Sequence, residues 1–125
     1  VENAGANVLD DYEEGTWTVT NSETPQTEVG RYVKIGANVT CYFNLQSHAS
    51  NTTTGDMGGL PFPLANNDAA NNGTGFVSYQ NSESGEVWSI AADKNATTWS
   101  FRVADTQKQI AADKGVTGMI AFTLA

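Results

Sequence analysis

The sequence predicts an all-β domain, arranged as an antiparallel two-sheet sandwich or jelly roll of about eight strands. Three observations predict this fold. Helical periodicity is almost missing, short runs alternate apolar with polar residues, and clusters of Gly, Asn, Ser and Thr separate these runs from Thr16 onward. Because two packed sheets each hide an apolar face, a sandwich is favoured over an open sheet.

The clearest strand covers residues 38–46. Val39, Cys41 and Phe43 fall on one face of that strand and Tyr42 on the other, as the two-residue period of a strand requires. Residues 107–113 are as compatible with a loop as with a helical turn. The other expected strands cover residues 16–20, 29–35, 56–60, 75–80, 86–91, 97–103 and 117–124.

The N-terminal part of the chain differs from the rest in composition. Residues 9–14 read Leu-Asp-Asp-Tyr-Glu-Glu, and the pattern becomes strand-like directly after Gly15. We therefore expect an acidic connector over residues 1–14 and a β-sandwich head over residues 15–125. The first residue is Val1, and the opening residues lack the basic start and apolar centre of a signal peptide, so we interpret the chain as part of a longer polypeptide.

Charge and composition argue against several classes of partner. Asp and Glu number 14 against 6 Lys and Arg, which gives a formal net charge of −8. Nucleic-acid binding depends on clustered basic residues, so we expect no nucleic-acid partner. No apolar run approaches the roughly 18 residues that span a bilayer, so we expect no membrane insertion. The single cysteine, Cys41, is expected to be a buried small hydrophobe and forms no disulfide within the chain.

The acidic block at residues 9–14 has the residue types of two kinds of chemical site, a calcium site and a glycosidase carboxylate pair. Asp10, Asp11, Glu13 and Glu14 could hold calcium or act as a glycosidase pair, but they lack the EF-hand spacing and the burial that separates two carboxyl pKa values. His48 has neither a second histidine for a metal nor a nucleophile elbow nearby. We expect no catalytic residue, no metal, no cofactor and no enzyme activity.

Polar loops and exposed aromatic residues are the expected ligand-binding features. Residues 47–55 and 63–73 are predicted loops, and Tyr42 lies opposite the apolar face of its strand. A tyrosine in this position suits a subunit interface and sugar stacking equally. The candidate ligand-binding residues are Tyr42, His48, Asn51, Thr53, Asn67, Asp68, Asn72 and Tyr79.

Three motifs carry a resemblance to a known family. Residues 9–19 read LDDYEEGTWTV, residues 30–36 read GRYVKIG, and residues 59–62 read GLPF. In this order they resemble the LDDYEEGTWTP, GxYxKIG and GLPF motifs in the C-terminal β-rich heads of bacteriophage tail-fibre and tail-tip receptor-binding proteins, with Val19 in place of the proline. The resemblance implies a homotrimer on the virion, attached to an upstream fibre shaft or other virion proteins, that binds a host cell-surface glycan.

Two other functions remain open at this point. The same fold can serve as a capsid head fibre, a decoration protein or a trimerisation module, which would place it on the capsid surface and make assembly its role. It can also be part of a glycan-cleaving tailspike, which would require a buried pair of carboxylates in a groove or across the subunit interface.

Overall fold

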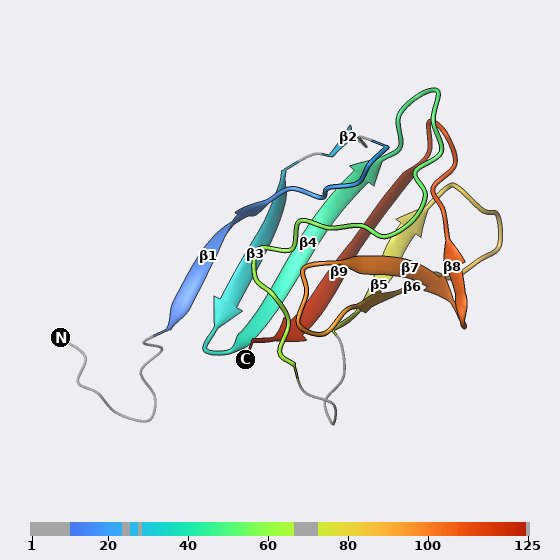
Figure 1. The fold of residues 1–125 in the computed structure, drawn as a ribbon. Coiled ribbons are helices and arrows are strands. Elements are labelled where there is room, and N and C mark those ends of the chain that lie inside the picture. Colours follow the sequence, from blue (N-terminus) through green and yellow to red (C-terminus); the bar gives the residue numbers. More distant parts are fainter. Residues whose placement is uncertain (1–10, 24–25, 28, 67–72, 125) are drawn as a thin grey trace.

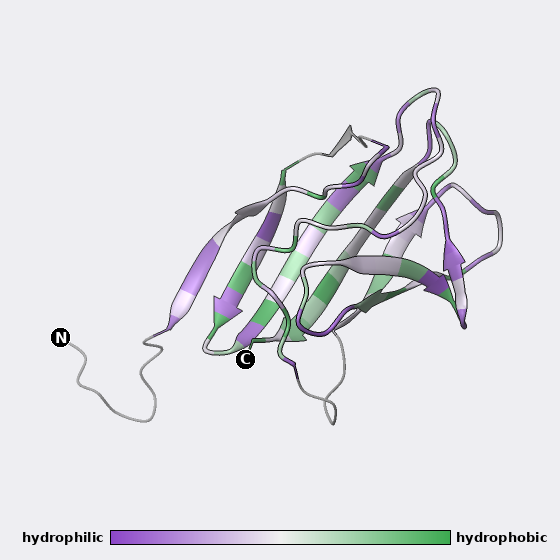
Figure 2. Ribbon diagram, in the orientation of Figure 1, coloured by the Kyte–Doolittle hydropathy of each residue, from purple (hydrophilic) through white to green (hydrophobic). Residues whose placement is uncertain are grey.

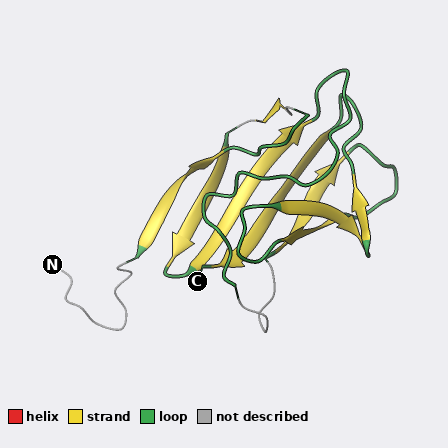
Figure 3. Ribbon diagram, in the orientation of Figure 1, coloured by secondary structure: helices red, strands yellow, loops and turns green. Residues whose placement is uncertain are grey.

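The computed structural model describes residues 11–23, 26–27, 29–66 and 73–124, which form nine β-strands and no helix (Figures 1 and 3). Every strand pairing is antiparallel, so the predicted all-β antiparallel class is confirmed. The strands are β1 (Tyr12–Trp17), β2 (Gln26–Thr27), β3 (Gly30–Ile35), β4 (Asn38–Gln46), β5 (Thr74–Gln80), β6 (Ser89–Ala92), β7 (Trp99–Val103), β8 (Thr106–Lys108) and β9 (Gly115–Thr123).

The strands form one continuous sheet that folds back on itself. Hydrogen bonds join them in the order β1-β3-β4-β9-β5-β6-β7-β8, and β2 pairs with β4 outside this path. The described strands therefore do not divide into the two separate sheets expected from the sequence. In Figure 1, β7 crosses in front of β9. The rings of Phe43 on β4 and Trp99 on β7 lie 5.0 Å apart, although three strands separate them in the sheet. One sheet thus supplies both walls of the core.

A glycine permits the close approach of two strands where the sheet turns. Gly75 pairs with Ile120 of β9 on one side and Ile90 of β6 on the other. A Cβ at Gly75 would overlap the carbonyl oxygen of Met119 and lie 3.0 Å from the Cα of Ile120. Two residues further along β5 the register with β9 shifts, and such an irregularity bends and twists a strand.

The segment after β4 closes the folded sheet. Met57 exchanges two backbone hydrogen bonds with Trp99 of β7, with N···O distances of 2.7 and 2.8 Å. The next residue, Gly58, bonds in the same way to Thr20, which follows β1. Residues 56–60, predicted to be a strand, make these isolated bridges and one more backbone hydrogen bond, from Leu60 to Thr97, instead of a continuous ladder. Leu60 and Leu64 nevertheless point into the core.

Aromatic residues fill much of the core. Trp99 lies 5.1 Å from Phe101 and 6.3 Å from Trp17, measured between ring centroids, and Trp88 lies 5.5 Å from Phe101. The strands alternate between hydrophobic and hydrophilic residues along their length (Figure 2), as expected for a sheet with one buried face. The buried apolar residues are Trp17, Val19, Val39, Cys41, Phe43, Leu45, Met57, Leu60, Leu64, Trp88, Ile90, Ala92, Trp99, Phe101, Ile110, Val116, Ile120 and Phe122.

Cys41 lies in this core, as the sequence predicted, and its burial makes the thiol unreactive. Burial raises the pKa of Cys41 to about 12, so almost no reactive thiolate exists at pH 8. We expect a thiol-specific disulfide reagent to leave the folded protein unmodified at pH 8 and to label one thiol per chain in denaturant. Rapid labelling without denaturant would contradict the burial of Cys41.

The first strand begins earlier than expected. β1 starts at Tyr12 rather than at Thr16, so part of the predicted connector belongs to the sheet. The hydroxyl of Tyr12 donates to Glu14 at 2.9 Å, and that of Tyr32 donates to Glu13 at 2.6 Å. These hydrogen bonds raise the pKa of both tyrosines, because the neutral phenol is the donor.

Candidate functional site

The strand register places a continuous row of side chains on the side of the sheet that faces away from the core. We call this side of β1, β3, β4, β9 and β5 the outer face. Thr16, Arg31, Tyr42, Met119 and Phe76 lie opposite one another across these five strands, in that order. Tyr42 has 51% of its surface exposed and Phe76 has 53%. Large aromatic side chains with this exposure are candidates for binding a ligand or a partner.

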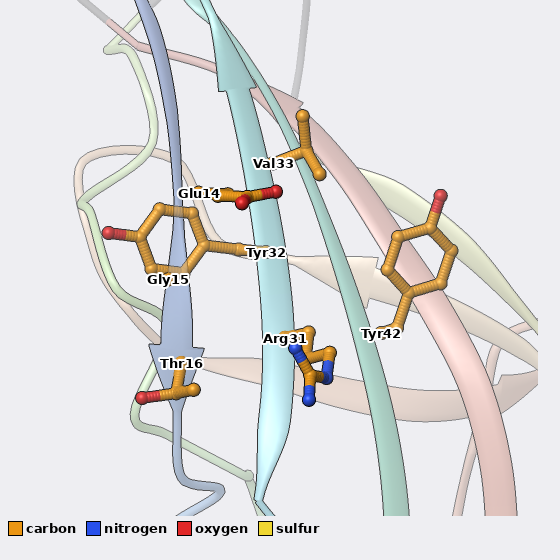
Figure 4. Close-up of a pocket in the computed structure, with 7 residues that line it drawn as sticks. All are labelled: Glu14, Gly15, Thr16, Arg31, Tyr32, Val33 and Tyr42. Carbon is orange, nitrogen blue, oxygen red and sulfur yellow. The ribbon is translucent and has the colours of Figure 1, made fainter.

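A hollow of about 320 Å³ lies on the outer face beside Tyr42, and we call it the Tyr42 hollow. Figure 4 shows Arg31 between Thr16 and Tyr42, with Glu14 and Val33 one row further along the same strands. The ring of Tyr32 lies across Gly15, where an added Cβ would sit 2.7 Å from the ring. The hollow is lined by Glu14, Gly15, Thr16, Arg31, Tyr32, Val33 and Tyr42.

The Tyr42 hollow combines a ring with charged and hydroxyl groups. The carboxylate of Glu14 accepts a hydrogen bond from Tyr12 and keeps further acceptor capacity, because each carboxylate oxygen has two lone pairs. Within the described residues, no hydrogen bond or salt bridge engages the guanidinium of Arg31. The residues of the Tyr42 hollow therefore offer a ligand the ring face of Tyr42 for stacking, five N–H donors on Arg31, and hydrogen-bond acceptors on Glu14 and Thr16.

A second, more apolar depression lies on the other side of Tyr42. It has a volume of about 270 Å³, and we call it the Phe76 groove. Tyr42 contributes to both depressions and separates them. The groove is lined by Tyr42, Phe43, Phe76, Ser78, Thr117, Gly118 and Met119.

Two of the residues predicted to bind a ligand share the outer face. Tyr42 lies on β4, and Tyr79 pairs with Thr117 of β9 one row away, with 58% of its surface exposed. The structure therefore brings the two tyrosines to one side of the sheet.

The predicted loop residues lie elsewhere. His48 and Asn51 belong to the loop that follows β4, where the ring Nδ1 of His48 lies 3.0 Å from the hydroxyl of Ser50 and Asn51 is exposed. Thr53 is fully buried and its hydroxyl lies 2.7 Å from that of Ser47. The prediction that Thr53 contacts a surface ligand is therefore wrong. A polar residue in a loop is expected to face solvent, but the side chain of Thr53 is buried.

The second predicted loop contains residues that lie outside the described part of the chain, namely Asn67, Asp68 and Asn72. The described residues that flank that loop lie at one end of the sheet. Ala65 bonds to Thr123 at one end of β9, whereas Ser47 bonds to Lys114 just before the other end. The described flanks of the two predicted loops thus lie at opposite ends of the sheet.

Of the residues that line the Tyr42 hollow, sequence reasoning found only Tyr42 and missed the three polar ones, Glu14, Thr16 and Arg31. Glu14 was assigned to the connector, and Thr16 and Arg31 were treated only as strand residues. In the predicted strand at 29–35, Arg31 shares a face with Val29, Val33 and Ile35, and such an apolar pattern predicts a core face. No local signal in the sequence therefore placed Arg31 beside Tyr42.

Comparisons with known proteins add no further constraint. No family model, curated protein or solved structure matches this chain. Within residues 11–23, 26–27, 29–66 and 73–124, no three His, Cys, Asp or Glu side chains gather as a metal-binding group. The same residues include no helix long and apolar enough to cross a membrane.

Proposed function

We propose that this chain is a non-enzymatic head domain of a bacteriophage fibre, located on the virion, that binds a host surface glycan as a homotrimer. The Tyr42 hollow is the observation that carries the glycan part of the proposal. The three motifs in residues 9–62 support the fibre part. Both rest on β1 and β3, because the first two motifs contain those strands and the hollow lies between them and Tyr42.

The chemistry of the Tyr42 hollow suits a sugar ring. The apolar C–H face of a pyranose packs on the exposed ring of Tyr42, as apolar surfaces pack on aromatic ones. Arg31 donates to sugar hydroxyls or to a ring substituent, and Glu14 accepts from hydroxyls on the same edge. An open hollow with one ring and few polar groups gives weak binding, about millimolar for one site. Three copies on one fibre raise the effective affinity by roughly 10²–10⁴ when they engage together.

The arrangement of carboxylates supports a role in binding rather than in cleavage. Glycoside hydrolysis needs two carboxyl groups roughly 5–10 Å apart on either side of the scissile bond. Glu14 is the single carboxylate among the described residues that line the Tyr42 hollow. Its neighbour Glu13 points to the opposite face of β1 and accepts a hydrogen bond from Tyr32. Cleavage at the Tyr42 hollow would therefore need a second carboxylate from outside the described residues that line it.

A glycan array tests this proposal. We expect the fluorescently labelled protein to bind a subset of bacterial surface glycans. Tyr42→Ala should weaken that binding about tenfold, because it removes the stacking surface, whereas Tyr42→Phe should retain most of it. Val87→Ala, at an exposed apolar position outside the Tyr42 hollow, is the matched control and should bind as the wild type does.

Two results would contradict the glycan proposal. One is the absence of binding to any glycan by the assembled protein. The other is equal binding by the wild type and Tyr42→Ala. Release of new reducing ends from a bound polysaccharide would instead favour the tailspike alternative.

The uncharged part of the outer face favours a second candidate function, namely a capsid decoration or trimerisation module. Phe76 and Tyr79 are exposed on β5, a strand without a charged residue, as expected of a surface covered by protein. A gold-labelled antibody against this chain separates the two candidates on intact virions. Label at the distal end of the tail supports the receptor-binding head, and label over the capsid supports decoration.

A further inference from the structure

The centre of the outer face is free of charge in a strongly acidic protein. The strands β4, β9 and β5 are adjacent in the sheet, and none of them contains Asp, Glu, Lys or Arg. The whole chain has a formal net charge of −8. Two of the large apolar side chains that the described chain exposes, Phe76 and Tyr79, stand on this face, and Tyr42 stands at its margin beside the Tyr42 hollow. Aromatic enrichment with depletion of charge is the composition of an interface core.

Two polar side chains that line the Phe76 groove, Ser78 and Thr117, are already hydrogen-bonded within the chain. The hydroxyl of Thr117 donates to the side-chain oxygen of Asn44 at 3.1 Å, and the hydroxyl of Ser78 donates to the backbone oxygen of Thr117 at 3.1 Å. Covering a polar group that keeps its partner costs much less than covering an unpaired one. Covering this part of the face therefore leaves these polar groups paired. The Tyr42 hollow differs, because the N–H donors of Arg31 there are available to a ligand.

The charge of the chain favours a second copy as the occupant. Two copies that each carry a charge of −8 repel one another wherever acidic residues meet. They approach at least cost across a surface without carboxylates, and β4, β9 and β5 provide such a surface. A basic partner protein would instead be attracted to the acidic parts of the chain.

The size of the face sets the expected strength of the contact. Three strands of up to nine residues, about 4.8 Å apart and with a rise of about 3.3 Å per residue, form a flat area of roughly 400 Å². Side chains that project from the sheet, such as Phe76 and Met119, make the accessible surface of this face larger than its flat area. The contact is therefore close to the lower limit of specific interfaces, about 600 Å² per partner.

We propose that the uncharged outer face of β4, β9 and β5, centred on the Phe76 groove, packs against a second copy of this chain. The proposal concerns a contact between two copies of the chain, and it depends neither on glycan binding nor on the trimer of the proposed function. The contact covers Phe76, Tyr79 and Met119 and leaves the Tyr42 hollow open at its margin. Each copy then presents its Arg31 and Glu14 to solvent beside the interface.

Sedimentation equilibrium of the whole chain, between about 10 and 200 µM, tests this surface. We expect the wild type to have a mass that rises with concentration to a multiple of the 13.3 kDa of one chain. Phe76→Glu places carboxylates at the contact and should sediment as a 13.3 kDa monomer. Thr106→Glu adds the same charge at an exposed position on β8, at the opposite end of the strand order from β1 and three strands away from β5, and it should associate as the wild type does.

Two outcomes would overturn the assignment of this surface. They are a wild-type monomer throughout the concentration range, or association that survives Phe76→Glu. Circular dichroism verifies that the variant is folded, and Tyr79→Glu replaces it if Phe76→Glu is unfolded. Titration of a monovalent oligosaccharide distinguishes this failure from failure of the proposed function, since the monomeric variant retains the Tyr42 hollow and should bind the oligosaccharide as the wild type does.

Discussion

Trp99→Ala is expected to lower the free energy of unfolding by about 3–5 kcal/mol, the range for removing a large aromatic side chain from a core. Trp99 is fully buried and its ring lies within 6.3 Å of the rings of Trp17, Phe43 and Phe101, measured between centroids. It is also the residue through which β7 bonds to Met57. The substitution therefore leaves a cavity between the two walls of the folded sheet. Urea denaturation followed by fluorescence and circular dichroism measures the effect.

The control for Trp99→Ala is an apolar substitution outside the core. Val87→Ala removes two methyl groups from a side chain that is 86% exposed, and it should change the free energy of unfolding by less than about 0.5 kcal/mol. If Trp99→Ala lowered the free energy of unfolding by less than about 1 kcal/mol, β7 would not pack on β4. That result would contradict the folding of the sheet onto itself.

Gly75→Ala is expected to lower the free energy of unfolding by about 3 kcal/mol or more, although it adds a single methyl group. The new Cβ would overlap the carbonyl oxygen of Met119 in the neighbouring strand, and backbone atoms cannot move aside as a flexible side chain can. The methyl group forces β5 away from β9 and disrupts the ladder at the turn of the sheet. Overpacking of this kind commonly costs about 1–3 kcal/mol, and a backbone clash belongs at the upper end. Thermal denaturation of the variant gives the measurement.

Gly115→Ala is the matched control for Gly75→Ala. Gly115 lies in β9 of the same sheet, and a Cβ there would meet only the backbone oxygen of Leu45, at the ordinary contact distance of 3.5 Å. Removing a glycine from an extended strand reduces the entropy of the unfolded chain, so this variant should be neutral or slightly more stable. Equal losses at both positions would show that the close approach at Gly75 is not the cause.

Some strands were predictable because their residues alternate without exception. The predicted strand at 38–46 has the bounds of β4, and the predicted strand at 117–124 correctly gave most of β9. Both strands lie in the centre of the sheet, where one face is fully buried. A buried face imposes a strict period of two on the sequence, and that period is a local signal.

Other elements depend on contacts far apart in the sequence and could not be predicted. The acidic start of β1 is typical of a solvated connector, but Tyr32 bonds to Glu13 and Lys34 forms a 2.8 Å salt bridge with Asp11. The segment around Met57 has the composition of a strand, but it pairs at isolated positions because it closes the sheet between β7 and Thr20. The folding of one sheet onto itself depends on Gly75 and on register, which sequence pattern does not reveal.

The candidate site was predictable only in its aromatic part. Tyr42 was expected on the outside of its strand because it alternates with core residues, and it is there. Thr53 was misassigned, since a loop residue can be buried when its hydroxyl finds a partner such as Ser47. Arg31 and Glu14 needed the order of β1, β3 and β4, which is a property of the folded sheet.

The most direct test of the account is to map the bound glycan by amide NMR. The probe is the array-selected oligosaccharide, titrated into the ¹⁵N-labelled Phe76→Glu variant, which we expect to be monomeric. Our proposal predicts that the largest shift changes fall on Thr16, Arg31 and Tyr42, on the three strands that form the Tyr42 hollow. Changes confined to the loop containing His48 and Asn51, with these three strands unaffected, would contradict the outer face as the binding surface.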